Sequence, residues 1–179
     1  SAGAGAAMAG LMVAGGGLNP SEKQTEVFIA RAENYSLDLS RIIGQGLAEL
    51  GIEPREIIGK RILLKPNLVE TNPRARHICT HPAMVQGAAE AFLRLGAAKV
   101  VIGEGTGHCT DPYRTLDQSG LAEVVNRNLP FVDLNQDEVF STPNRGSFTK
   151  MKRLILPREF ARADIVVSLA KMKTHHWVG

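Results

Sequence analysis

Apolar positions in this chain fall into short continuous runs separated by amphipathic stretches. Because most of the runs are continuous rather than alternating, they are typical of strands covered on both faces, as in a parallel sheet. Each run also has the length of a β-strand. The predicted strands span residues 26–30, 61–64, 99–102, 131–134, 154–157 and 165–170.

A helix between two of these runs has the clearest signals. Pro82 suits the first turn of a helix, and Gly96 suits the position just past its end. Between them, apolar residues recur at helical spacing, at positions 85, 88, 89, 92 and 93. The strand–helix–strand order predicts a right-handed parallel crossover.

Weaker patterns complete the predicted fold. Residues 39–50 and a segment from Ser119 to about residue 128 predict two further helices, and the polar residues 135–150 predict an irregular excursion or a β-ribbon. The fold class is therefore α/β, a layered, mainly parallel sheet with crossover helices. We expect residues 25–179 to be the N-terminal portion of a single, incomplete α/β domain.

Composition narrows the classes of function. Hydrophobic residues make up 44% and charged residues 22% of the chain, as in globular proteins. Only 5% of the residues are aromatic, the net charge is +3, and no compact basic stripe is visible. We therefore expect no nucleic-acid partner.

The N-terminal residues 1–20 suggest targeting. Residues 2–18 carry no charge and consist mostly of Ala and Gly, which is too weakly apolar for a stable membrane span. This composition resembles the h-region of a twin-arginine export signal, although the twin arginines themselves are absent. It predicts an exported, periplasmic protein. If the segment is instead a flexible tail or a cloning remnant, the protein is cytoplasmic.

Polar residues with reactive side chains follow three of the predicted strands. Ligands of open parallel sheets bind beyond the carboxyl ends of the strands, so these side chains should share one rim. If the last strand continues in extended geometry, its alternate side chains should also share one face. The rim residues are Lys65, Asn67, Glu104, Lys171, Lys173, His175 and His176, and His81, which opens the crossover helix, joins them.

Two roles suit these residues. The lysines would bind the phosphate or carboxylate of a small anionic ligand, helped by Asn67 and His81. His175 or Glu104 would handle protons as catalytic groups, since imidazole titrates near neutrality. Each residue also has a plainer explanation. Lys65 and Asn67 suit a turn beside Pro66, and His81 suits a helix entry. A loop carboxylate such as Glu104 is commonly solvated, and Lys171 and Lys173 also suit solvated charges at a strand end.

Histidine and cysteine spacing raises the question of a metal. His81, His175 and His176 are the candidate ligands, and the series His77-x-Cys79-x-His81 adds to them, although it matches no established metal motif. No C-x-x-C motif is present, so we expect no iron–sulfur cluster within this segment. In an oxidising compartment Cys79 and Cys109 could pair, but nothing in their spacing requires it.

Read in order, several segments resemble the family catalogued as domain of unknown function 362. They are residues 63–69 (LLKPNLV), 80–82 (THP), 100–104 (VVIGE), 119–121 (SGL) and 163–169 (ADIVVSL), running into Lys171-Met172-Lys173-Thr174-His175. The resemblance covers residues 25 to 179 and implies a domain that continues beyond them. Family members are bacterial or archaeal, sometimes exported by the twin-arginine route and sometimes fused to ferredoxin-type iron–sulfur modules. The resemblance implies no reaction.

Two functional hypotheses follow. The first is an exported α/β enzyme that acts on a small anionic ligand, with metal assistance from the histidines. The alternative is a non-catalytic redox-accessory or metal-binding module, associated with an iron–sulfur or other redox partner protein.

Overall fold

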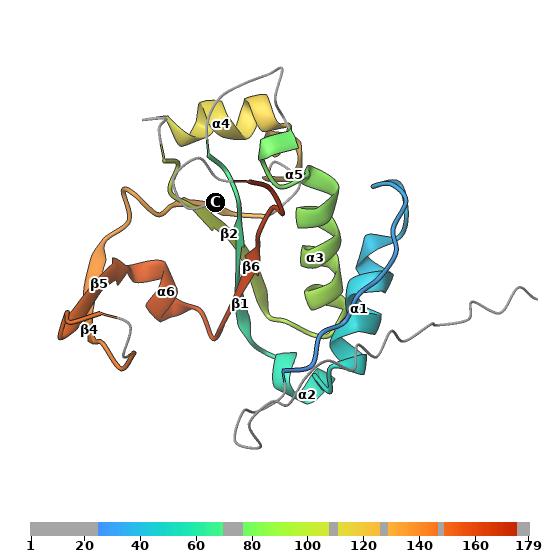
Figure 1. Ribbon diagram of the computed structural model, residues 1–179, viewed down its shortest axis with the longest axis horizontal. Coiled ribbons are helices and arrows are strands. Elements are labelled where there is room, and N and C mark those ends of the chain that lie inside the picture. The colour runs from blue at the N-terminus through green and yellow to red at the C-terminus, as the bar shows by residue number, and fades with distance from the viewer. Residues whose placement is uncertain (1–24, 70–76, 108–110, 126–128, 147–148, 175–179) are drawn as a thin grey trace, which may run out of the picture.

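A computed structural model describes residues 25–69, 77–107, 111–125, 129–146 and 149–174. Its centre is a sheet of four parallel strands in the order β3-β2-β1-β6 (Figure 1). The predicted α/β class with a mainly parallel sheet is confirmed. The strands are β1 (Arg61–Pro66), β2 (Lys99–Glu104), β3 (Phe131–Asp133) and β6 (Ile165–Leu169).

The strand order reverses direction at β1. From β1 the chain builds outwards through β2 to β3, and then returns to add β6 on the other side of β1. In register, Leu64 lies beside Ile102 of β2 and beside Val167 of β6. The junction between β1 and β6 is therefore the topological switch point of the sheet, the place where open α/β sheets commonly bind ligands.

Helices cover one face of this sheet. Helix α3 (Pro82–Arg94) packs directly on β1 and β2, and α1 (Leu39–Glu49) packs on the outer side of α3 (Figure 1). Helices α4 (Pro112–Ser119) and α5 (Ala122–Val125) lie near the carboxyl ends of the strands, and the short α2 (Pro54–Ile57) precedes β1. The predicted crossover helix is confirmed.

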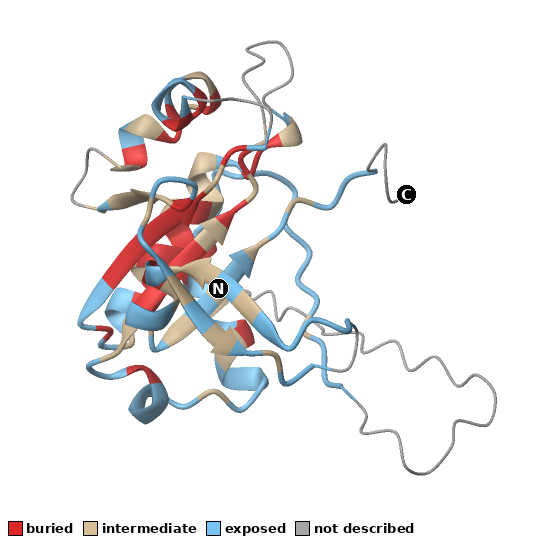
Figure 2. Cartoon of the chain, turned by 90° about the vertical axis from the view of Figure 1, so that its left-hand side faces the viewer, coloured by how far each residue is buried: buried red, intermediate tan, exposed pale blue. Residues whose placement is uncertain are grey.

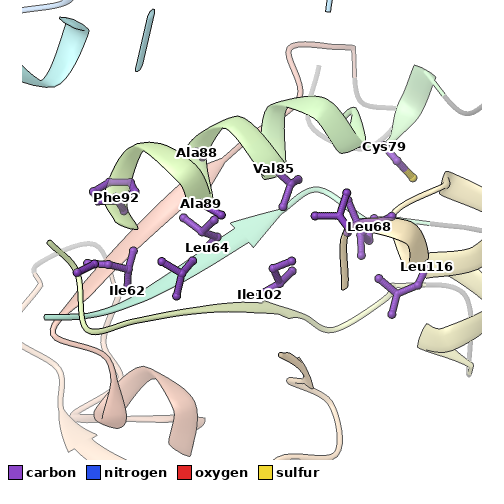
Figure 3. Close-up of a cluster of buried hydrophobic side chains, with 14 of the residues drawn as sticks. Ile62, Leu64, Leu68, Cys79, Val85, Ala88, Ala89, Phe92, Ile102 and Leu116 are labelled. Carbon is purple, nitrogen blue, oxygen red and sulfur yellow. The ribbon is translucent and has the colours of Figure 1, made fainter. Parts of the chain in front are cut away.

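The core forms between α3 and the central strands. Alternate residues of β1 and β2 point towards the apolar stripe of α3, and these side chains are almost completely buried (Figures 2 and 3). Burying one such aliphatic side chain contributes about 1.5–3 kcal/mol. The residues at its centre are Ile62, Leu64, Ile102, Val85, Ala88, Ala89 and Phe92.

A β-ribbon lies on the side of the sheet away from α3. Strands β4 (Val139–Pro143) and β5 (Arg153–Pro157) pair antiparallel and lead into α6 (Arg158–Arg162) before β6 (Figure 1). Of the two predictions for residues 135–150, the ribbon is the correct one.

Two predicted elements are wrong. Residues 26–30 form no strand, because no neighbouring strand pairs with them; Val27 is 74% and Ile29 is 87% exposed. Phe28 instead packs on Gly46 of α1, where an added Cβ would lie 2.5 Å from the Phe28 ring.

The second error concerns the start of the helix predicted from Ser119 to about residue 128: Ser119 ends α4, and the predicted range contains the shorter helix α5, Ala122–Val125. Gly120 adopts a left-handed conformation, with φ of 80°, and terminates α4. The start of α4 was missed, although Asp111 and Pro112 carry its signal: the Asp111 side chain accepts hydrogen bonds from the backbone N–H groups of Tyr113 and Arg114.

None of the helices within the described ranges is long and apolar enough to cross a membrane. The predicted export segment, residues 1–20, lies outside the described residues.

Candidate functional site

The carboxyl ends of β1, β2 and β6 meet at one edge of the sheet, because the three strands are parallel neighbours. Lys65, Asn67, Glu104 and Lys171 all lie in or directly after these ends, as the sequence predicts. Their side chains nevertheless belong to separate groups with different contacts.

Lys65 and Glu104 form one group, an ion pair between neighbouring strands. The Lys65 Nζ lies 2.8 Å from Oε1 and 2.9 Å from Oε2 of Glu104. Glu104 is only 5% exposed, and its Oε1 also accepts a hydrogen bond from the Gly105 N–H. Each charge is compensated by the other, so this ion pair links β1 to β2; we call it the Lys65–Glu104 clamp.

Asn67 belongs to a second group, which holds a loop in place. Its Nδ2 donates to the Ile78 carbonyl at 2.8 Å, and its backbone N–H donates to Thr80 Oγ1 at 2.8 Å. The Thr80 hydroxyl in turn donates to the Leu169 carbonyl at the end of β6, at 2.7 Å. Thr80 therefore bridges the ends of β1 and β6, and the side-chain amide of Asn67 has a positioning role.

This loop leads into α3 through His81, which is the N-cap of the helix. Its Nδ1 accepts the Ala83 N–H at 3.1 Å, and its carbonyl accepts the Met84 N–H. Pro82 has no N–H to offer. The first N–H groups of α3 therefore already have hydrogen-bond acceptors, and an anion near this helix must be bound by side chains. The partial positive charge of the helix N-terminus remains.

The His81 ring also stacks on Tyr35, with ring centroids 3.9 Å apart and planes within 3°. Burial, and secondly the charge of Lys171, lower the pKa of His81 below its usual value. The ring is therefore neutral at pH 7. Since Nδ1 accepts the capping bond, the proton lies on Nε2, which can serve as a donor to a ligand.

Lys171 completes this third group. Its Nζ donates to the Tyr35 hydroxyl at 3.1 Å and lies 5.7 Å from the centre of the Tyr35 ring. Among the described residues, no carboxylate forms an ion pair with Lys171. Strand β6 ends at Leu169; beyond it, Lys171 is half-buried and Lys173 is exposed, so the two lysines differ in their surroundings.

A cleft of about 400 Å³ opens between these elements, close to the switch point. Its walls come from the segment before α1, the loop into α3, the junction of α4 and α5, and the residues after β6. This volume lies at the small end of the range for ligand sites. Its polar lining residues include Tyr35, His77, His81, Glu123 and Lys171.

The described residues contain no group of three metal-binding side chains placed around a common point. His77, Cys79 and His81 all line the cleft without forming such a group. Cys79 is buried and has a free thiol, next to Leu68 and Leu116 in the core (Figure 3). The remaining candidates, His175, His176 and Cys109, lie outside the described residues.

Three residues of the site were missed at the level of sequence. Tyr35 lies in a segment with no regular structure, and Glu123 lies on a four-residue helix, so no periodic pattern singled them out. Thr80 belongs to the Thr-His-Pro segment, which carries the family resemblance but gives Thr80 no role of its own. A polar residue next to the N-cap residue of a helix that starts with proline is a signal that could have found it.

Comparison with protein-family models matches residues 62–179 to the domain of unknown function family DUF362. No curated protein and no solved structure matches the chain. The match spans more than half of the sequence and includes β1, α3, β2 and β6, which carry the candidate site. The chain belongs to the DUF362 family.

Proposed function

We propose that this member of the DUF362 family binds a small anionic ligand in the cleft at the switch point, with Lys171 as the anchor. The observation that carries the proposal is the position of Lys171. Lys171 lines the cleft, and its ammonium group donates to the Tyr35 hydroxyl and pairs with no carboxylate of the described residues. A half-buried cation without a counter-charge favours an anion as its partner.

Neutral donors support the same ligand. The Tyr35 hydroxyl contacts Lys171, and His81 presents a protonated Nε2 while its Nδ1 is used by the helix cap. Phosphate and carboxylate oxygens accept hydrogen bonds from such groups. The switch point adds a topological reason, because the loops at this position diverge and leave room for a ligand.

The chemistry performed on the ligand is a further part of the proposal. His81 touches the cleft and is close enough to act on a bound molecule, whereas Glu104 lies in the clamp with Lys65. His175 follows Lys171 closely in sequence and keeps its proposed role in proton transfer.

The alternative, a redox-accessory or metal-binding module, rests on His175 and His176. Export by the twin-arginine route also remains a proposal, based on residues 1–20.

Titration of the protein with inorganic phosphate and with acetate, followed by amide chemical shifts, tests the anchor. We expect shifts in the segments 77–81 and 119–123, which contain residues that line the cleft. Lys171→Met should weaken binding at least about tenfold, because a charge-assisted hydrogen bond contributes about 1.5–3 kcal/mol.

Two further lysines serve as comparisons. Lys152→Met removes an exposed cation near the β-ribbon and should leave binding unchanged. Lys173→Met should have only a small effect, since Lys173 is exposed and does not line the cleft. If Lys171→Met binds both anions as the unaltered protein does, the proposed anchor is wrong.

A further inference from the structure

The two walls of the cleft carry opposite charges. Lys171, after β6, lines one wall, and Glu123, in the first turn of α5, lines another. The two side chains do not form an ion pair with each other, and neither pairs with another charged group among the described residues. A lysine and a glutamate therefore line the same cleft without an ion pair between them among the described contacts.

We propose that the ligand of this cleft is a small zwitterion, a molecule that carries an ammonium group as well as its anion. The inference rests on the proposed function, because the anion is the part that Lys171 holds. Glu123 then receives the ammonium group at the other wall. The compounds that fit this chemistry are amino acids and similar short molecules with a carboxylate or a phosphate at one end.

The charges of the described lining residues favour a zwitterion over a ligand with charge of one sign. Lys171 and Glu123 are the lysine and the acidic residue among the described residues that line the cleft, and the lowered pKa of His81 favours the neutral form of its ring at pH 7. A ligand with only negative charge would satisfy Lys171 but meet repulsion from Glu123. A ligand with only positive charge would satisfy Glu123 but meet repulsion from Lys171. A zwitterion satisfies both walls, and electrostatic complementarity of this kind decides specificity.

The surroundings of Glu123 suit recognition. Its side chain is exposed to solvent, so it binds without the desolvation of a buried carboxylate, and its contribution is correspondingly modest. The volume of about 400 Å³ limits the ligand to a small molecule. The neutral groups between the charges, Tyr35 and Ser119 among them, would contact the ligand's middle part.

Matched pairs of probes test the inference on the full chain. Glycine, 3-aminopropionate and 4-aminobutyrate are compared with acetate, propionate and butyrate, which lack only the ammonium group. We expect at least one amino compound to bind about fivefold more tightly than its partner, the gain of a partly exposed charge pair. Glu123→Gln should reduce this ratio to about one without weakening the carboxylates. Glu49→Gln, on α1, should leave the ratio unchanged.

The outcomes separate the two proposals. If the plain carboxylates bind in a Lys171-dependent way but no amino compound binds more tightly, the zwitterion is excluded and anion binding stands. If Glu123→Gln leaves a preference for amino compounds intact, Glu123 is not the group that receives the ammonium. If neither the six probes nor inorganic phosphate binds, the proposed anion site is overturned, and the zwitterion with it. If phosphate alone binds, anion binding stands and the zwitterion is excluded.

Discussion

Removing the cation of the Lys65–Glu104 clamp should destabilise the protein more than removing a cation at the surface. In Lys65→Met the aliphatic part of the side chain is kept, while Glu104 loses the ammonium group at 2.8 Å from its Oε1. Glu104 is then left with the Gly105 N–H as its partner among the contacts described above. A buried carboxylate without its counter-charge is costly.

The magnitude follows from distance and exposure. At 2.8 Å the Coulomb attraction is about 6 kcal/mol for an effective dielectric constant of about 20. Much of it offsets the desolvation of Glu104, and the Lys65 side chain is 39% exposed, so water screens the pair. We therefore expect Lys65→Met to lower the free energy of unfolding by about 2 kcal/mol.

Urea unfolding, followed by circular dichroism, measures the effect. A double-mutant cycle of Lys65→Met with Glu104→Gln should give a coupling of about 1–2 kcal/mol, because the second change removes the charge that the first leaves unpaired. The matched control is Lys60→Met, whose partner Asp164 lies 3.8 Å away, with both side chains more than 40% exposed. It should cost less than about 0.5 kcal/mol. Equal losses for Lys65→Met and Lys60→Met, or zero coupling, would refute the clamp.

Two further predictions concern packing and pH. Gly87→Ala should lower the free energy of unfolding in urea by about 1–3 kcal/mol, because the new Cβ would lie 2.7 Å from the Leu39 Cβ at the contact of α1 with α3. Gly44→Ala should raise it by about 0.5–1 kcal/mol, because a Cβ at this position has nothing within 4 Å. The opposite order of the two variants would contradict this packing. Burial, and then the Lys171 charge, lower the pKa of His81 in the folded state below 6.5, so the unfolded chain takes up the proton first. The contribution of His81 should not change with pH well above 6.5, and stability should fall as the pH drops from about 6.5 towards the folded pKa and level off below it. His81→Asn, which can still cap the helix, should show a smaller fall in melting experiments.

The central layer could be predicted because local and long-range signals agree there. Helix α3 has a proline start, an apolar stripe and a glycine end, and all three coincide with its burial against β1 and β2. Residues 26–30 lacked such agreement. Their apolar side chains suggested a strand, but strand formation needs a partner, and this segment pairs with none.

It could be predicted from the sequence that these polar side chains lie at one rim of the sheet, but not which of them contact one another. In a parallel sheet all strands end at the same edge, whatever their order. The contact of Lys65 with Glu104, 39 residues away in the sequence, requires in addition only that β1 and β2 be neighbours. The contact of Lys171 with Tyr35 spans 136 residues and depends on which side of β1 receives β6. No periodicity contains that information.

The position of β6 is therefore the feature on which the site depends. Had β6 paired with β3 instead of β1, the end of β6 would lie beyond the far edge of the sheet, away from the loop that enters α3. Its pairing with β1 allows the Thr80 hydroxyl to bond the Leu169 carbonyl. That bond places Lys171 within reach of Tyr35, and through it beside His81. The neighbours of Lys171 therefore follow from the order of the strands in the sheet. This explains why we assign Lys171, rather than Lys173 or Lys65, to the ligand.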